Sequence, residues 1–233
     1  MARSRFFLLA NGLLLAIVLV GFSRTLYLRT LFDVAPIPPS LYIHGAALTL
    51  WFLFALIQPS LIAAGRTSLH RTVGYTAASY AAIVVISGLT ATARMASQLK
   101  SPNDAENIIV WGNYLSLLAF AGLVGAAVVL RRRPESHKRL MLLASVSIVG
   151  PALGRFPLWP IFAAGLDAAR NDAIGGLLAL LALMIGYDLW SRGRPHPATW
   201  IGALGIFASI GAAVALGLST AGFAFLHAVF ARA

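Results

Sequence analysis

The chain has 233 residues, of which 59% are hydrophobic and only 11% are charged, and its mean hydropathy is +0.83. An ordinary soluble domain has about 25% charged residues, and one as apolar as this chain would expose large hydrophobic patches. The composition therefore excludes a typical soluble domain and indicates an integral membrane protein. The chain has no cysteine, which excludes disulfides, iron–sulfur clusters and thiolate metal sites.

Seven apolar stretches are candidates for membrane spans, each of which needs about 20 residues in a helix. Helices are expected because backbone polar groups inside a bilayer must be satisfied within the segment. The sequence thus predicts an all-α, polytopic transmembrane bundle that forms a single domain over residues 1–233. The predicted spans are residues 6–22, 41–64, 72–93, 108–130, 140–153, 173–190 and 199–218. The fifth is the shortest, and the sidedness of everything after it depends on whether it crosses fully.

Lysine and arginine fix the expected orientation, because cytoplasmic loops of membrane proteins are enriched in both. Eleven of these residues fall on one side of the predicted spans and seven on the other. The richer side consists of Arg3, Arg5, Arg66, Arg71, Arg131, Arg132, Arg133, Lys138, Arg139, Arg192 and Arg194. We therefore expect a cytoplasmic N-terminus, an external C-terminus and multi-pass insertion in the cell inner membrane.

The formal net charge of +11 points to lipid as the partner. In a soluble protein it would suggest nucleic acid, but here the basic residues lie in short loops between apolar runs. There they orient the spans and bind anionic lipid headgroups on the cytoplasmic face. We expect the bilayer as partner and no nucleic acid, with a homo-oligomer or a membrane-protein partner left open.

The spacing Arg-x-x-x-His occurs three times, at Arg66–His70, Arg133–His137 and Arg192–His196. Each copy precedes an odd-numbered predicted span, so the three imidazoles are expected at one membrane depth, close to Asp188. Three histidines and a carboxylate can bind a divalent metal such as zinc and leave a position open for water. The candidate metal ligands are His70, His137, His196 and Asp188. The alternative is that these histidines cap helices or bind lipid phosphates.

A second set of polar side chains lies on the second predicted span, where His44, Trp51 and Gln58 recur every seven residues and so share a helical face. An ionisable residue inside a span is a functional hypothesis by default. His44 and His227 are expected at a similar depth, and two histidines from different helices are what haem b ligation requires. The alternative is that His44 is a hydrogen-bonded residue between helices and His227 an interfacial one.

Two charged residues flank the turn between the fifth and sixth spans. Arg155 ends the fifth span and Asp172 opens the sixth. A salt bridge that closes this hairpin is the expected role, and an anion- or substrate-binding mouth is the alternative.

The sequence resembles a group of uncharacterised bacterial integral membrane proteins. The resemblance is carried by His44-Gly45, Trp51, Gln58, Gly65-Arg66, Leu69-His70-Arg71-x-x-Gly74, residues 131–141, residues 150–155 and residues 188–198. It covers most of the chain and implies the same multi-pass architecture. The His-Arg-x-x-Gly and His-Lys-Arg-Leu-Met corners are also loosely similar to haem membrane proteins of the cytochrome b561 type, which place paired histidines within a four-helix core.

The expected function is that of an inner-membrane protein with a histidine-based haem or metal site for electron transfer or cofactor handling. One alternative is a non-enzymatic small transporter or assembly partner in a membrane complex. A second is a metal-dependent membrane hydrolase, which requires the three corner histidines to converge and a cavity to reach Asp188.

Overall fold

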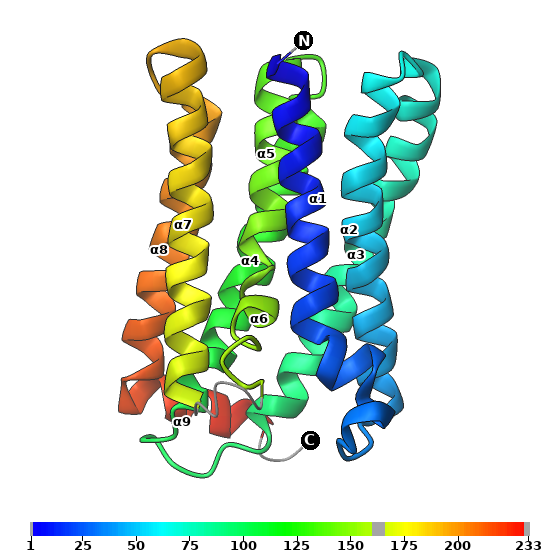
Figure 1. The fold of residues 1–233 in the computed structure, drawn as a ribbon. Coiled ribbons are helices and arrows are strands. Elements are labelled where there is room, and N and C mark those ends of the chain that lie inside the picture. The colour runs from blue at the N-terminus through cyan, green and yellow to red at the C-terminus, as the bar shows by residue number, and fades with distance from the viewer. Residues whose placement is uncertain (1, 160–165, 231–233) are drawn as a thin grey trace.

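The computed structural model describes residues 2–159 and 166–230, and in them every regular element is helical (Figure 1). The long helices are α1 (Ala2–Phe22), α2 (Pro39–Ala63), α3 (Thr67–Ala96), α4 (Glu106–Val129), α7 (Leu166–Arg192) and α8 (Pro197–Gly217). The short elements are η1 (Ser23–Tyr27), η2 (Arg29–Phe32), α5 (Pro134–Ser147), α6 (Gly150–Leu153) and α9 (Thr220–Phe230). The all-α prediction is therefore confirmed for the described residues.

Six helices are long and apolar enough to cross a membrane, which supports a multi-pass membrane protein. They correspond to six of the seven predicted spans, with ends that shift by up to seven residues. The exception is the fifth, where the predicted stretch 140–153 is divided between α5 and α6. α5 begins already at Pro134, whose missing N–H costs nothing in the first turn of a helix.

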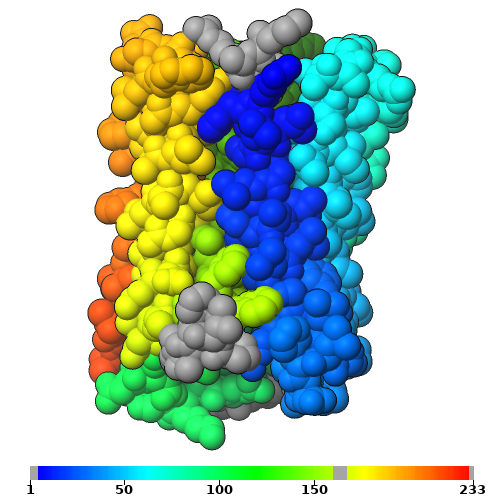
Figure 2. Space-filling model, in the orientation of Figure 1, coloured from blue at the N-terminus to red at the C-terminus, as the bar shows by residue number. Residues whose placement is uncertain are grey.

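The helices stand side by side, and α5 occupies the middle of the bundle. It packs against α1, α2, α4, α7 and α8, and almost every side chain from Arg139 to Val149 is buried. On the face drawn in Figure 2, α1 (blue) lies between α7 (yellow) and the α2–α3 pair (cyan) and covers much of this centre. The shortest of the predicted spans is thus enclosed by the other helices.

Three tight connections lie at the same end of the bundle as the start of α1 (Figure 1). They join α2 to α3, α4 to α5 and α7 to α8. Gly65 and Gly193 both have a φ of +73°, the left-handed conformation in which helices commonly end. α9 lies at the other end. It is separate from α8, which ends at Gly217.

Candidate functional site

The structure brings together two of the three corner histidines. The rings of His70 and His137 lie edge to face with their centroids 6.5 Å apart. Nδ1 of His70 is 3.3 Å from the main-chain oxygen of Gln58, and Nδ1 of His137 is 2.8 Å from that of Ala127. In the tautomer that donates Nδ1–H to these carbonyls, Nε2 of each ring keeps a free lone pair. We refer to His70 and His137 as the corner pair.

His70 and His137 have equivalent positions because each lies four residues after the N-cap residue of its helix. Arg66 is the N-cap residue of α3, and Arg133 is the N-cap residue of α5. The main-chain N–H of His70 donates to the oxygen of Arg66 at 3.0 Å, and that of His137 to the oxygen of Arg133 at 2.9 Å. Each histidine is therefore one turn inside its helix, and its ring reaches back to the end of the preceding helix.

The third corner has the same spacing but a different register. Here His196 itself is the N-cap residue of α8, and its Nδ1 accepts the N–H of Ala198 at 3.1 Å. Pro195 and Pro197 flank it, and Pro197 occupies the first turn of the helix. The Arg-x-x-x-His repeat thus places His196 at a helix start rather than one turn inside.

The four predicted metal ligands accordingly divide into two groups. His70 and His137 form the corner pair, whereas the main-chain N–H of His196 donates to Oδ2 of Asp188 at 2.9 Å. Among the described residues, no three histidine, aspartate or glutamate side chains are grouped so that they could hold a metal ion. A metal at the corner pair would therefore have two protein ligands from this set, with the remaining positions open.

Gln58 connects the α2 motif to the corner pair. Turned so that its nitrogen faces the ring of His70, its side-chain amide donates to the main-chain oxygen of His70 at 3.1 Å and accepts the N–H of Gly74 at 3.1 Å. In that orientation the amide nitrogen also donates to Nδ1 of His70, so that Nδ1 is an acceptor and the ring proton lies on Nε2. The tautomer with a free Nε2 requires the amide turned back, with its oxygen facing Nδ1. Gln58 thus links α2 to α3 and contacts the imidazole of His70.

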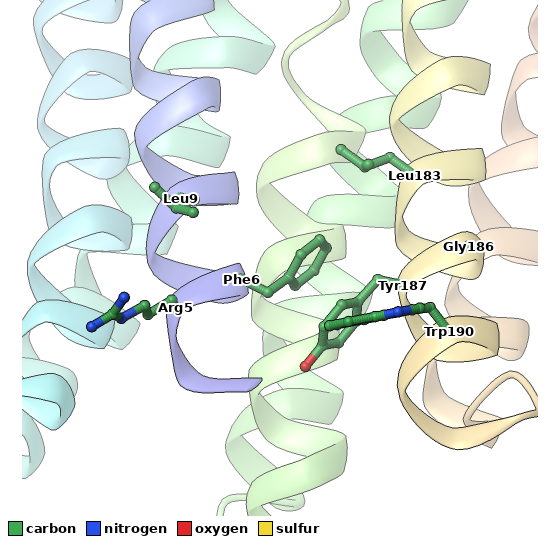
Figure 3. Close-up of a pocket in the computed structure, with 7 residues that line it drawn as sticks. All are labelled: Arg5, Phe6, Leu9, Leu183, Gly186, Tyr187 and Trp190. Carbon is green, nitrogen blue, oxygen red and sulfur yellow. The ribbon is translucent and has the colours of Figure 1, made fainter. Parts of the chain in front are cut away.

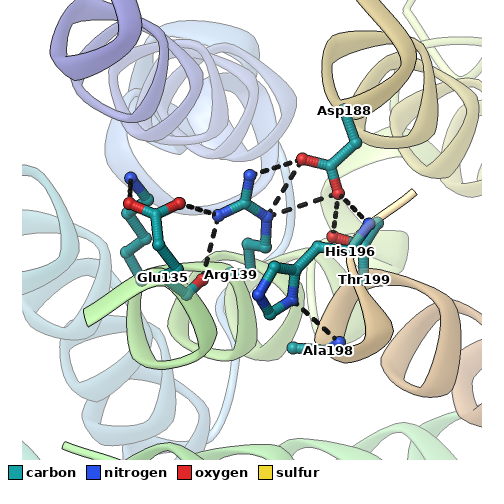
Figure 4. A network of polar contacts seen from close by, with 7 residues as sticks. Glu135, Arg139, Asp188, His196, Ala198 and Thr199 are labelled. Atoms are coloured by element: carbon teal, nitrogen blue, oxygen red, sulfur yellow. Dashed lines mark hydrogen bonds and ion pairs between the residues drawn. The ribbon is translucent and has the colours of Figure 1, made fainter. Parts of the chain in front are cut away.

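A network of polar contacts occupies the interior beside the third corner (Figure 4). Arg139 and Asp188 have side chains that are only 1% and 0% exposed, and their Nη2 and Oδ1 atoms are 2.5 Å apart. Oδ2 of Asp188 also accepts the hydroxyl of Thr199 at 2.5 Å. Nη1 of Arg139 contacts Oε2 of Glu135 at 2.5 Å. Asp188 is therefore fully engaged as the partner of Arg139, which explains why it does not join the corner pair.

Two groups at the edge of this network have shifted pKa values. Lys138 and Arg139 donate to the carboxylate of Glu135, and these contacts hold its pKa below the usual range despite the opposing effect of partial burial. The pKa of His196 is lowered, first by burial and then by the positive charges of Arg139 and Arg192. At neutral pH the network therefore holds an ionised glutamate and an uncharged imidazole.

The two predicted haem ligands lie on α2 and α9. Nδ1 of His44 is 3.1 Å from Oγ of Ser87 on α3. His227 is exposed and stacks on Phe223 of its own helix with 5.5 Å between ring centroids. His44 thus has the interhelical hydrogen bond named as the alternative, and haem ligation by this pair stays a prediction.

The remaining polar residues of the prediction have local partners. Nε1 of Trp51 donates to Oγ of Ser145 at 3.1 Å, and its ring meets Phe120 edge to face, so that it ties α2 to the central α5. Arg155 donates to Oγ1 of Thr25 at 3.2 Å and to the oxygen of Pro151 at 2.6 Å. The expected Arg155–Asp172 salt bridge is not among the ion pairs of the described residues, and Asp172 is exposed.

An open apolar groove of about 560 Å³ lies between α1 and α7. Figure 3 shows the rings of Phe6, Tyr187 and Trp190 along it, with the guanidinium of Arg5 directed away from Tyr187. Phe6 and Tyr187 stack with their centroids 3.7 Å apart. The other residues that line the groove are Leu9, Leu183 and Gly186. Asp188 is fully buried and does not line the groove, so the cavity that the hydrolase hypothesis requires is not this one.

Comparisons with known proteins add no family to this geometry, because no family model, curated protein or solved structure matches the chain.

Proposed function

We propose that the chain is a seven-span inner-membrane protein whose corner pair binds a divalent metal such as zinc at the cytoplasmic boundary. Six spans are the long apolar helices, and the seventh is α5 followed by α6. These two run in series from the end where α1 begins toward the other end (Figure 1). The basic connections then face the cytoplasm, as the excess of lysine and arginine there favours.

The observation that carries the metal proposal is the anchoring of both rings. Metal-binding histidines nearly always donate their second ring N–H to a carboxylate, a carbonyl or water, which fixes the tautomer and the ring orientation. In the corner pair Nδ1 of His137 lies at the main-chain oxygen of Ala127. Nδ1 of His70 lies at both the main-chain oxygen and the side-chain amide of Gln58, and it donates when the amide oxygen faces it. The same arrangement recurs on two hairpins that are distant in the sequence, so the two Nε2 atoms are presented from rigid helix starts.

The separation of the rings is close to that of two ligands of one ion. Two imidazoles bound at about 2.0–2.1 Å from a tetrahedral zinc place their ring centroids about 5 Å apart. The centroids of the corner pair are 6.5 Å apart, so a shared tetrahedral ion requires the two rings to move closer by roughly 1 Å. Two protein ligands leave further coordination positions for water, substrate or a partner, which suits cofactor handling better than a closed structural site; electron transfer would require a redox-active ion in place of zinc.

Purified full-length protein in detergent tests the proposal. Metal analysis is expected to find about one ion per chain, and His70→Ala or His137→Ala is expected to lose it. His196→Ala is the matched control, because it removes a histidine with the same Arg-x-x-x-His spacing that N-caps α8 instead. Metal content that is the same in all four proteins, or no metal after reconstitution with zinc, contradicts the proposal.

An absorption spectrum of the same sample tests the haem hypothesis separately. A Soret band that His44→Ala removes supports haem at His44 and His227 and a relationship to the cytochrome b561 type. A colourless, metal-free protein would instead favour the transporter or assembly partner. The hydrolase hypothesis has less support, since Asp188 pairs with Arg139 and not with the corner pair.

A further inference from the structure

The end of the bundle opposite the corner pair holds two arginines, Arg24 and Arg155, that form no ion pair with a carboxylate of the described residues. Arg24 of η1 donates to the main-chain oxygen of Leu158, and Arg155 donates to the hydroxyl of Thr25, the residue after Arg24. These two contacts cross between η1 and the segment after α6. They therefore place Arg24, Arg155 and Trp159 on two adjoining segments, and we refer to these three residues as the cluster.

The contrast with Arg139 shows what this cluster is missing. Arg139 is buried between two carboxylates, Asp188 and Glu135. The partners of Arg155 are a hydroxyl, a carbonyl and the ring of Phe22, whose centroid is 4.1 Å from the guanidinium carbon. A cation removed from water is costly unless it is paired, and neutral partners compensate only part of that cost.

Two N–H donors of the cluster are buried and have no acceptor among the residues that the structure describes. They are Nε of Arg24 and Nε1 of Trp159. Buried donors are nearly always satisfied in native proteins, and an exception calls for an explanation such as a bound ion. The Arg24–Leu158 contact joins Arg24 to the residue that precedes Trp159 in the chain.

The acidic residues of this end do not supply the missing charge. Asp33 is exposed, and Asp104 accepts the main-chain N–H groups of Lys100 and Ser101. Asp167 pairs with Arg170, and residues 160–165, which follow Trp159, contain no acidic residue. None of the ion pairs among the described residues includes Arg24 or Arg155.

We infer that Arg24, Arg155 and Trp159 form a binding site for a phosphate group at this end of the bundle. Guanidinium groups bind phosphate oxygens through charge-assisted hydrogen bonds, and the indole N–H adds a neutral donor. Donors from three side chains suit a phosphate group, with its three or more acceptor oxygens, better than a carboxylate. The phosphate belongs either to a lipid headgroup of that leaflet or to a water-soluble phosphate compound.

The test uses full-length protein in detergent and phosphate-free buffer. One arm titrates inorganic phosphate, and the other adds phosphatidylglycerol and counts adducts by native mass spectrometry. We expect one saturable site per chain in at least one arm. A response to phosphate alone assigns the site to a soluble compound, and a response to the lipid alone assigns it to a headgroup.

Three variants connect the signal to the cluster. Arg24→Gln and Arg155→Gln are each expected to weaken binding about tenfold or more, the effect of losing a hydrogen bond to a charged group. Trp159→Phe keeps the aromatic ring, so it preserves the fold and is expected to weaken binding less. Arg170→Gln removes a charge from the same end that already pairs with Asp167, and it is expected to bind like the wild type.

Three results would overturn the inference. One is the absence of saturable binding in both arms. Another is equal binding by the wild type and by the variants Arg24→Gln and Trp159→Phe. These two variants keep Arg155, so they remain informative if Arg155→Gln does not fold. The third is binding of acetate as strong as that of phosphate, which would assign the site to carboxylates.

Discussion

Arg139 and Asp188, which are 49 positions apart in the sequence, meet in the interior with Nη2 and Oδ1 2.5 Å from each other. Arg139 belongs to the central α5, and Asp188 belongs to the last part of α7. The pair therefore fixes the short helix that lies between the long ones. Replacing Arg139 leaves the Asp188 carboxylate buried without its ion-pair partner, which typically costs about 3–5 kcal/mol, whereas Arg139 keeps its contact with Glu135 when Asp188 is replaced.

Arg139→Met is expected to lower the free energy of unfolding by roughly 3–5 kcal/mol, and Asp188→Leu by less, because Arg139 keeps its ion pair with Glu135. The double variant is expected to lose clearly less than the sum, because neither charge is then left unpaired. Unfolding in mixed micelles, followed by circular dichroism, gives the three values. Additive losses would show that the two side chains do not stabilise each other.

The stability of the α7–α8 corner is expected to fall below pH 6.5. The folded pKa of His196 is lowered by burial and by the nearby charges of Arg139 and Arg192, whereas the unfolded residue titrates near its ordinary value of about 6.5. The unfolded chain therefore binds more protons as the pH falls through 6.5 toward the folded pKa, and stability declines across that window.

His196→Asn isolates this effect, because asparagine also caps helices well but does not titrate. Between about pH 7.5 and 5.5 the melting temperature of the variant is expected to fall less than that of the wild type. The lowered pKa of Glu135 also reduces stability as the pH falls. Its effect sets in only below the ordinary pKa of a glutamate, so it lies at lower pH than the effect of His196. Parallel curves for the two proteins would contradict the assignment to His196.

Close packing of α4 and α8 depends on Gly217. A Cβ at this position would lie 2.5 Å from Cα of Ile108 and 2.7 Å from its nitrogen, so Gly217→Ala must push the main chains apart. We expect a loss of about 1–3 kcal/mol, as for overpacking in a core. Gly186→Ala is the control, because its Cβ meets nothing within 4 Å. Equal stability of the two variants in thermal unfolding would show that the contact is not tight.

Much of the fold could be predicted from the sequence, because apolar runs and turn residues are local signals. Six long helices match the predicted spans, and Gly65 and Gly193 mark two of the corners. The division of residues 140–153 into α5 and α6 was not predicted. A helix packed on all sides by other helices need not be uniformly apolar, so hydropathy gives its limits poorly.

The candidate site could be predicted only in part. The Arg-x-x-x-His spacing indicated which residues share one end, but a spacing does not give helix register. Arg66 and Arg133 are N-cap residues, whereas at the third corner the N-cap is His196. The pairing of Asp188 with Arg139 was also missed, since Arg139 was assigned to the orienting charges of a loop. Two opposite charges at the same end of the bundle could have suggested the pair: Arg139 lies near the start of the fifth predicted span, and Asp188 lies near the end of the sixth.

The absence of cysteine makes the seven-span topology directly testable with single-cysteine variants at exposed positions. The informative positions are Thr67, Arg132, Asn103, Asn171 and Thr220, all of which are exposed. In intact cells with a permeable outer layer, a membrane-impermeant maleimide is expected to label the last three and spare the first two. Labelling of Asn171 is decisive, because an unlabelled Asn171 would show that α5 and α6 do not cross together.

The corner pair is tested most directly by zinc titration of the metal-free, full-length protein against a competing chelator. Loss of one ligand is expected to weaken zinc binding at least tenfold in His70→Ala and in His137→Ala, and the double variant is expected to bind little more weakly than either. His196→Ala is expected to bind like the wild type. Zinc affinity that is unchanged in His70→Ala and His137→Ala, or that falls only in His196→Ala, would contradict a shared metal site at His70 and His137.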